Sequence, residues 1–269
     1  MVERAFYRTN WFARVINGSV SDRERAPFLL QSSTKPACSR HNNAEGVCVA
    51  KILKMENPNG FRRRPAPLPR SFYDRDPRLV AFDLVGKLLL RRKGRKLLIG
   101  RVVEVEAYLG RDDPAAHSFV GRTARNEVLW GPPGLSYVYF IYGNHYCFNV
   151  SCLPDGQAGG VLFRALEPLA GIEDMALARD LSGEDVKDLR KLTSGPGRLA
   201  EALGITCARD NGKDLTSPKS DLWIGEDGFR AGEIQRTPRI GITKAADLPL
   251  RFVLAGNRFV SGKVSSRAE

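Results

Sequence analysis

The feature that most constrains the fold is a succession of strand-like segments that follow one another without intervening helices. Two pairs of these segments are joined by short turns, Lys93-Gly94 in one pair and Gly143-Asn144 in the other. Such residues accept the backbone conformations that tight hairpin turns require. The predicted strands are 87–92, 96–108, 135–141, 145–152, 161–166, 221–224, 239–243 and 250–254. Strands that occur in runs indicate a mostly antiparallel sheet rather than alternating βα units.

Helices are predicted beside this sheet. Asp76 as N-cap and Pro77 at the first helical position indicate a helix start, and Gly86 is a typical helix end. Further helices are predicted at 172–181 and 197–203. The predicted fold class is therefore α+β, a single domain with a curved, mostly antiparallel β-sheet surrounded by helices.

The first 70 residues differ in composition from the rest of the chain. Residues 1–70 contain 13 Lys and Arg against 5 Asp and Glu, and they end in the Pro-rich basic segment 62–70. This composition predicts a disordered basic extension. The folded domain is expected over residues 71–262, and residues 263–269 are expected to form a short C-terminal tail.

The net charge of +12 favours a polyanionic partner, such as nucleic acid or an anionic membrane surface. No apolar stretch reaches the 18 residues of a membrane span, and the N-terminus lacks the apolar core of a secretory signal. Five cysteines without a C-x-x-C pair indicate a reducing, intracellular compartment. Three histidines without ligand spacing argue against a zinc site.

The segment 96–108 ends with carboxylates on one strand face. Because side chains alternate along a strand, Glu104, Glu106 and Tyr108 share a face. Taken alone, the segment favours a half-exposed strand with solvated carboxylates. The alternative is a carboxylate that acts as a general base beside an aromatic ring that stacks on a substrate.

Aromatic residues gather around the second turn. Tyr137 and Tyr139 share a strand face, and Tyr142 lies at the hairpin tip. A cross-strand cluster in the sheet core would account for the first two residues. A tyrosine at a turn is poorly placed for a core, but it could act as a wedge between base pairs.

Three further polar residues are less informative by themselves. A lone histidine such as His117 is usually structural or solvated, and Asn149 lies on the strand that returns from the aromatic turn. Arg164 closes an apolar strand, a position that indicates either an ion pair with a carboxylate or a bound anion. The ion pair is the favoured interpretation.

Taken together, these segments resemble the alkyladenine DNA glycosylases, also called methylpurine-DNA glycosylases. The matching strings are EVEAYLG at 104–110, AAHS at 115–118, YVYFIYG at 137–143, FNVS at 148–151, RALEPL at 164–169, GPG at 195–197 and PLRF at 249–252. The resemblance covers about residues 73–261. Several strings in the right order make it specific.

The resemblance implies a hydrolytic pair, that is, two residues that together carry out the hydrolysis. Glu106 resembles the family's general base, which activates the attacking water. Arg164 resembles the neighbour that holds this water and the target phosphate. No lysine lies within the matching strings, so we expect a monofunctional enzyme without lyase activity. The resemblance implies neither a metal nor an organic cofactor.

The resemblance also implies a pocket for a flipped base. Tyr108, His117 and Tyr139 resemble the walls of that pocket. Asn149 resembles a gate that excludes normal purines, chiefly through the amino group of guanine. Tyr142 resembles the intercalating wedge that fills the gap in the duplex.

The function implied is base-excision repair of alkylated or deaminated purines, the class of 3-methyladenine, 7-methylguanine, hypoxanthine and ethenoadenine. The expected partner is damaged double-stranded DNA, with no membrane, and the expected state is a monomer. We expect a cytoplasmic enzyme in a bacterium or a nuclear one in a eukaryote. A non-catalytic nucleic-acid binding module is the alternative, but it leaves Glu106 without a role. A nucleosidase acting on free nucleosides would leave Tyr142 without one.

Overall fold

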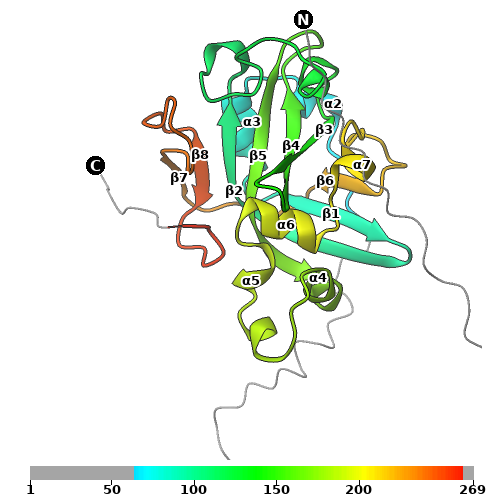
Figure 1. The fold of residues 1–269 in the computed structure, drawn as a ribbon. Helices are drawn as coiled ribbons and strands as arrows, with labels where there is room; N and C mark the ends of the chain where they lie inside the picture. Colours follow the sequence, from blue (N-terminus) through cyan, green and yellow to red (C-terminus); the bar gives the residue numbers. More distant parts are fainter. Residues whose placement is uncertain (1–63, 263–269) are drawn as a thin grey trace, which may run out of the picture. The chain divides into compact units, whose positions relative to one another are not determined.

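The computed structural model describes residues 64–262. Residues 1–63 of the predicted extension and the predicted tail lie outside the described residues. The described chain forms an eight-stranded sheet in the order β3-β4-β5-β2-β1-β6, with β8 paired to both β2 and β7 (Figure 1). The strands are β1 (Leu88–Lys93), β2 (Lys96–Tyr108), β3 (Ser136–Ile141), β4 (His145–Cys152), β5 (Gly159–Ala170), β6 (Leu222–Gly225), β7 (Ile234–Thr237) and β8 (Arg251–Leu254). All pairings of these strands are antiparallel, which confirms the predicted α+β class.

Short helices cover this sheet. They are α2 (Arg70–Tyr73), α3 (Pro77–Leu84), α4 (Ile172–Ala178), α5 (Arg190–Thr193), α6 (Pro196–Ala202) and α7 (Cys207–Asp210). The predicted start of α3 is confirmed, because the Asp76 side chain accepts a hydrogen bond from the Arg78 backbone N–H at 2.8 Å. No helix within residues 64–262 is long and apolar enough to cross a membrane.

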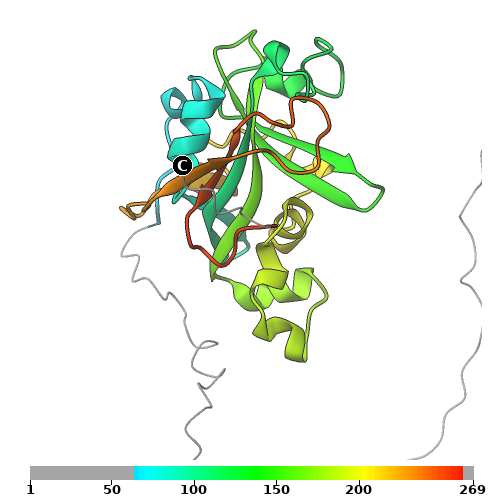
Figure 2. The ribbon, with the colours of Figure 1, turned by 90° about the vertical axis from the view of Figure 1, so that its left-hand side faces the viewer.

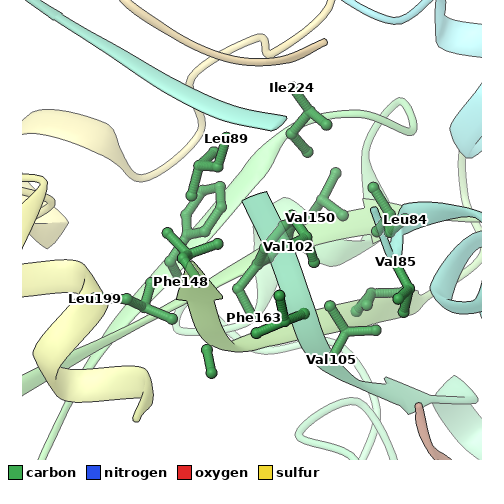
Figure 3. Packing of buried hydrophobic residues seen from close by; sticks show 14 of the residues in the cluster. Leu84, Val85, Leu89, Val102, Val105, Phe148, Val150, Phe163, Leu199 and Ile224 are labelled. Carbon is green, nitrogen blue, oxygen red and sulfur yellow. The ribbon is translucent and has the colours of Figure 1, made fainter. Parts of the chain in front are cut away.

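The hydrophobic core joins the central strands to α3 and α6. Phe148 from β4 and Phe163 from β5 are fully buried, and their ring centroids lie 4.8 Å apart. Val105 of β2, Leu84 of α3 and Leu199 of α6 belong to the same cluster (Figure 3). Burying each large apolar side chain stabilises the fold by roughly 1.5–3 kcal/mol. The central strands β2 and β5 are thus anchored in the core, and they carry Glu106, Tyr108 and Arg164 of the site described below.

Two predictions about chain segments are wrong. Residues 239–243 form a loop rather than a strand, and the strand that pairs with β8 is β7. The Arg239 side chain forms an ion pair with Asp113, and the Ile240 N–H donates to the Glu106 carboxylate rather than to a neighbouring strand. These two contacts hold the segment as a loop.

The second difference lies at the start of the described chain. Residues 64–70 belong to the predicted disordered extension, yet this segment packs against β6. The Leu68 N–H donates to the Ile224 carbonyl at 2.8 Å, and the Trp223 indole N–H donates to the Pro65 carbonyl at 3.0 Å. Residues of β6 supply both hydrogen-bond partners. They are distant in the sequence, so composition alone could not predict these contacts.

Candidate active site

A cavity of about 330 Å³ lies at one end of the central strands. It is lined by Tyr108, Ala115, Ala116, His117, Ser118, Leu129, Tyr137, Tyr139, Ile141, Tyr142, His145, Cys147, Asn149, Gly160, Leu162, Arg164, Pro196, Gly197, Ile240, Gly241 and Ile242. These residues come from β2 to β5, from the β3–β4 turn, from the short 3-10 helix Glu127–Trp130, from the start of α6 and from the loops 109–126 and 238–249. The volume is within the range of small-molecule sites, roughly 300–1,000 Å³.

Glu106 lies immediately behind the wall of this cavity. Its Oε1 accepts the Ile240 N–H at 2.8 Å and lies 3.3 Å from Arg164 Nη1, while its Oε2 accepts the Tyr108 hydroxyl at 3.1 Å. All three of these partners line the cavity. Glu106 and Glu104 are both fully buried, so the interpretation of this strand as half-exposed with solvated carboxylates is wrong. Pairing with β5, β1 and β8 covers both edges of β2.

Burial makes Glu106 harder to ionise. Desolvation raises the pKa of this carboxyl above its ordinary value, although Arg164, the Ile240 N–H and the Tyr108 hydroxyl all oppose the rise. The carboxylate is thus more basic than a solvated glutamate. A general base works best when its pKa approaches the working pH.

Glu104 anchors the arginine beside Glu106. Its Oε1 accepts Nε of Arg164 at 2.9 Å and Nε of Arg251 at 2.7 Å, and its Oε2 accepts the Ser261 N–H at 2.5 Å. The ion pair predicted for Arg164 is confirmed, and the guanidinium bridges both carboxylates. Two buried carboxylates thus face two buried guanidinium groups, which removes the cost of an unpaired buried charge.

An aromatic cluster forms another wall. The ring centroids of His117 and Tyr139 lie 4.5 Å apart, and those of Tyr137 and Tyr139 lie 5.4 Å apart. His117 Nδ1 and the Tyr137 hydroxyl form a hydrogen bond of 2.8 Å. Burial, together with nearby Arg125, holds the pKa of His117 below its usual value, so the imidazole is neutral near pH 7. Burial raises the pKa of Tyr137 to about 12, so it stays protonated. The wall is therefore uncharged and suits a flat ring.

The β3–β4 hairpin carries two further predicted residues. Asn149 is buried, and its side-chain amide donates to the Tyr137 carbonyl at 3.0 Å, which fixes its orientation. Tyr142 lies at the hairpin tip and is 82% exposed. Its φ of 55° and that of Gly143 at 75° place both residues in the left-handed region. Figure 2 shows this hairpin, in green, extending away from the sheet.

All seven predicted site residues thus lie at one place: six line the cavity and Glu106 lies directly behind it. Sequence reasoning missed Tyr137 as a wall residue, although its shared face with Tyr139 was a usable signal. It also missed Ile240 and Ile242, whose loop had been predicted as a strand. Cys147 is buried, and it lines the cavity as well.

Within residues 64–262, no group of three or more His, Cys, Asp or Glu side chains could hold a metal ion. The chemistry available from the described residues is that of a buried carboxylate beside an arginine, next to a cavity with uncharged aromatic walls. Such an arrangement can bind a planar ring and activate a water at its edge.

Comparison with known proteins agrees with this geometry. Residues 71–258 match the model of the methylpurine-DNA glycosylase family. The chain is 68% identical over 198 residues to a Koribacter versatilis protein named "Putative 3-methyladenine DNA glycosylase", covering 74% of this chain and 94% of that protein. Proteins of the same name from Burkholderia lata and Methanoculleus marisnigri are 47% and 48% identical. These matches cover 77% and 72% of this chain and 99% and 98% of those proteins.

The family match and these relatives show a DNA glycosylase, a hydrolase of DNA repair. The chain belongs to the methylpurine-DNA glycosylase family.

Proposed function

We propose that the protein excises alkylated and deaminated purines from duplex DNA, with Glu106 as the base that activates the attacking water. The substrates proposed are 3-methyladenine, 7-methylguanine, hypoxanthine and ethenoadenine. The observation that carries this proposal is the buried Glu106 carboxylate directly behind an aromatic cavity, joined to Tyr108, Arg164 and Ile240 of its wall.

This arrangement supports the proposed chemical step. The bond between the sugar C1′ and the base nitrogen breaks, and its electron pair leaves with the base. Water attacks C1′, and its proton passes to Glu106. Each carboxylate oxygen has two lone pairs, so a water can bind beside the hydrogen bonds that Glu106 already accepts. Arg164, held through Nε by Glu104, helps to hold this water and the target phosphate.

The cavity walls support this proposed substrate class. A purine stacks between Tyr108 on one strand and the His117–Tyr139 wall. A cationic base such as 3-methyladenine gains cation–π attraction of roughly 1–2 kcal/mol per contact, and a neutral His117 does not repel it. Hypoxanthine is neutral, so its departure needs protonation in addition to the activated water. Asn149, tethered to the Tyr137 carbonyl, acts as a gate against normal purines, chiefly through the amino group of guanine. The base 7-methylguanine carries the same amino group, but it is cationic and therefore a better leaving group than guanine.

The duplex must open before this chemistry. Flipping a nucleotide costs a few kcal/mol, least where the base is damaged or badly paired. Tyr142 projects from the hairpin tip and fills the gap that the nucleotide leaves. Among the described residues that line the cavity, none is a lysine. An amine that could form a Schiff base is therefore missing from that wall, which supports simple hydrolysis without lyase activity. We also propose that the enzyme acts as a monomer without a cofactor.

The decisive experiment compares wild type with Glu106→Gln in single-turnover assays on a duplex carrying one hypoxanthine. Glutamine keeps the volume but cannot accept the proton of water. We expect base release to fall about 10²-fold or more, while binding to the damaged duplex survives. Glu167→Gln is the matched control, because this β5 glutamate lies outside the cavity lining and binds Asn257.

Equal release by Glu106→Gln and wild type would remove Glu106 from the mechanism. Absence of release by wild type, from hypoxanthine and from methylated DNA alike, would favour the alternative of a non-catalytic binding module.

A further inference from the structure

A buried ion pair outside the proposed hydrolytic pair joins two loops of the cavity. Arg239 and Asp113 have fully buried side chains. Arg239 Nη1 lies 2.5 Å from Asp113 Oδ2, and Nη2 lies 2.9 Å from Oδ1. This is the bidentate geometry in which a guanidinium and a carboxylate hold each other in one orientation.

On one side, Asp113 organises the loop that follows β2. Its Oδ2 accepts the Leu109 N–H at 3.2 Å, and its Oδ1 accepts the Ala115 N–H at 3.1 Å. Burial opposes ionisation of Asp113, but the bonds from Arg239 and these N–H groups outweigh it and hold its pKa below the usual range. The charged carboxylate thus fixes the segment that leads directly to His117 in the cavity wall.

On the other side, Arg239 fixes the start of the loop 238–249. It donates to the Ala107 carbonyl at 3.0 Å, and its guanidinium carbon lies 4.7 Å from the ring centroid of Tyr108. The next residue in the chain, Ile240, donates its backbone N–H to Glu106 at 2.8 Å. The position of this N–H therefore depends on where Arg239 is held.

We propose that Arg239 and Asp113 are positioning residues for base excision, which hold the Ile240 N–H on Glu106 and lock together the two loops that wall the cavity. This inference rests on the proposed function. Neither residue touches the reacting atoms. Both act through the carboxylate and through the shape of the cavity, where a displacement of about 1 Å can cost 10²-fold in rate.

The pH profile reports on this role. The Ile240 N–H favours the ionised form of Glu106, so its loss raises the pKa of that carboxyl further. The other charged or titratable groups that face Glu106 are Glu104 and Tyr108 from β2, Cys147 from β4, Arg164 from β5, and Arg239 itself. Arg239→Lys keeps the positive charge but loses the planar fork. A shift in this variant therefore reports geometry rather than charge.

The chain supplies a matched control. Arg101 of β2 forms a similar two-bond pair with Asp227, at 3.2 and 2.8 Å, and lies over the ring of Phe229. None of these three residues lines the cavity. Arg239→Lys and Arg101→Lys should both lower the melting temperature, but only Arg239→Lys should change the chemistry. Asp113→Asn is the second variant, in case Arg239→Lys folds poorly.

The experiment measures single-turnover release of hypoxanthine between pH 5 and 9, together with hydrogen exchange of the Ile240 amide. For Arg239→Lys we expect a loss of about 10- to 100-fold, an acid limb moved to higher pH, and faster Ile240 exchange. Arg101→Lys should match wild type in all three. If wild type is active and Arg239→Lys matches Arg101→Lys in rate, pH profile and exchange, the pair is only structural and the inference is wrong. An inactive wild type would instead overturn the proposed function and this inference with it.

Discussion

Tyr142 offers a test in which stability and activity should change in opposite directions. We consider Tyr142→Asn. The tyrosine is 82% exposed, so its replacement removes almost no buried surface. Its φ of 55° is costly for a bulky residue, whereas asparagine adopts this region readily. The strain relieved is of the order of 1 kcal/mol. For a domain of this size, that corresponds to a melting temperature higher by roughly 2–4 °C.

The same substitution should impair action on duplex DNA. A stacked aromatic ring contributes roughly 1–3 kcal/mol per base, which corresponds to about 5- to 150-fold in the flipping equilibrium. We therefore expect Tyr142→Asn to release hypoxanthine from a duplex more slowly by about this factor. Release from a single strand, where there is no gap to fill, should change little.

Differential scanning fluorimetry and single-turnover assays on the two substrates measure both effects on one preparation. A variant that is no less stable but slower only on duplex supports the wedge. Equal slowing on single-stranded and duplex substrates would refute the reasoning, because it would place Tyr142 in the chemical step. Unchanged rates on both would show that the tip does not enter the duplex.

Four further predictions concern the site and the core. Burial is the main reason that the pKa of Glu106 is raised, and the ionised form is the active one. The rate of base release should therefore fall about tenfold per pH unit as pH drops below this raised pKa. A flat profile in single-turnover assays from pH 5 to 9 would contradict this prediction. Between the usual and the raised pKa, the same group should make stability fall as pH rises, since the native state binds the proton more tightly. Leu199→Ala removes a fully buried side chain of α6 and should lower the free energy of unfolding by about 2–5 kcal/mol, measured by urea denaturation; a loss below 1 kcal/mol would mean that α6 does not close the core. Borohydride should trap no covalent adduct with damaged DNA, and a trapped adduct would show lyase chemistry.

Local patterns in the sequence determined much of the framework. The period-two segment predicted β2 at residues 96–108, as found, and Asp76-Pro77 predicted the start of α3. The turn at Gly143 predicted an exposed Tyr142. These features depend on neighbours in the chain: side-chain alternation, capping and turn conformation are set within a few residues.

The seven site residues came from resemblance to a family rather than from such patterns. By its local pattern, Glu106 belonged to a solvated strand face, and Arg164 left two interpretations open. The resemblance to a known family assigned roles to both residues. Motifs that a family shares in the same order reflect its common tertiary structure, which a single segment does not.

Burial and the contacts between distant segments were decided only by the tertiary structure. Glu106 is buried because β5 and β8 pair along β2 and the loop 238–249 closes over its carboxylate, none of which lies near it in the sequence. The segment 239–243 has the composition of a strand, but a buried guanidinium that pairs with Asp113 stabilises a loop there. A period shows which side of a strand a residue faces. What covers that side is set by segments more than 50 residues away along the chain, and the burial raises the pKa of Glu106.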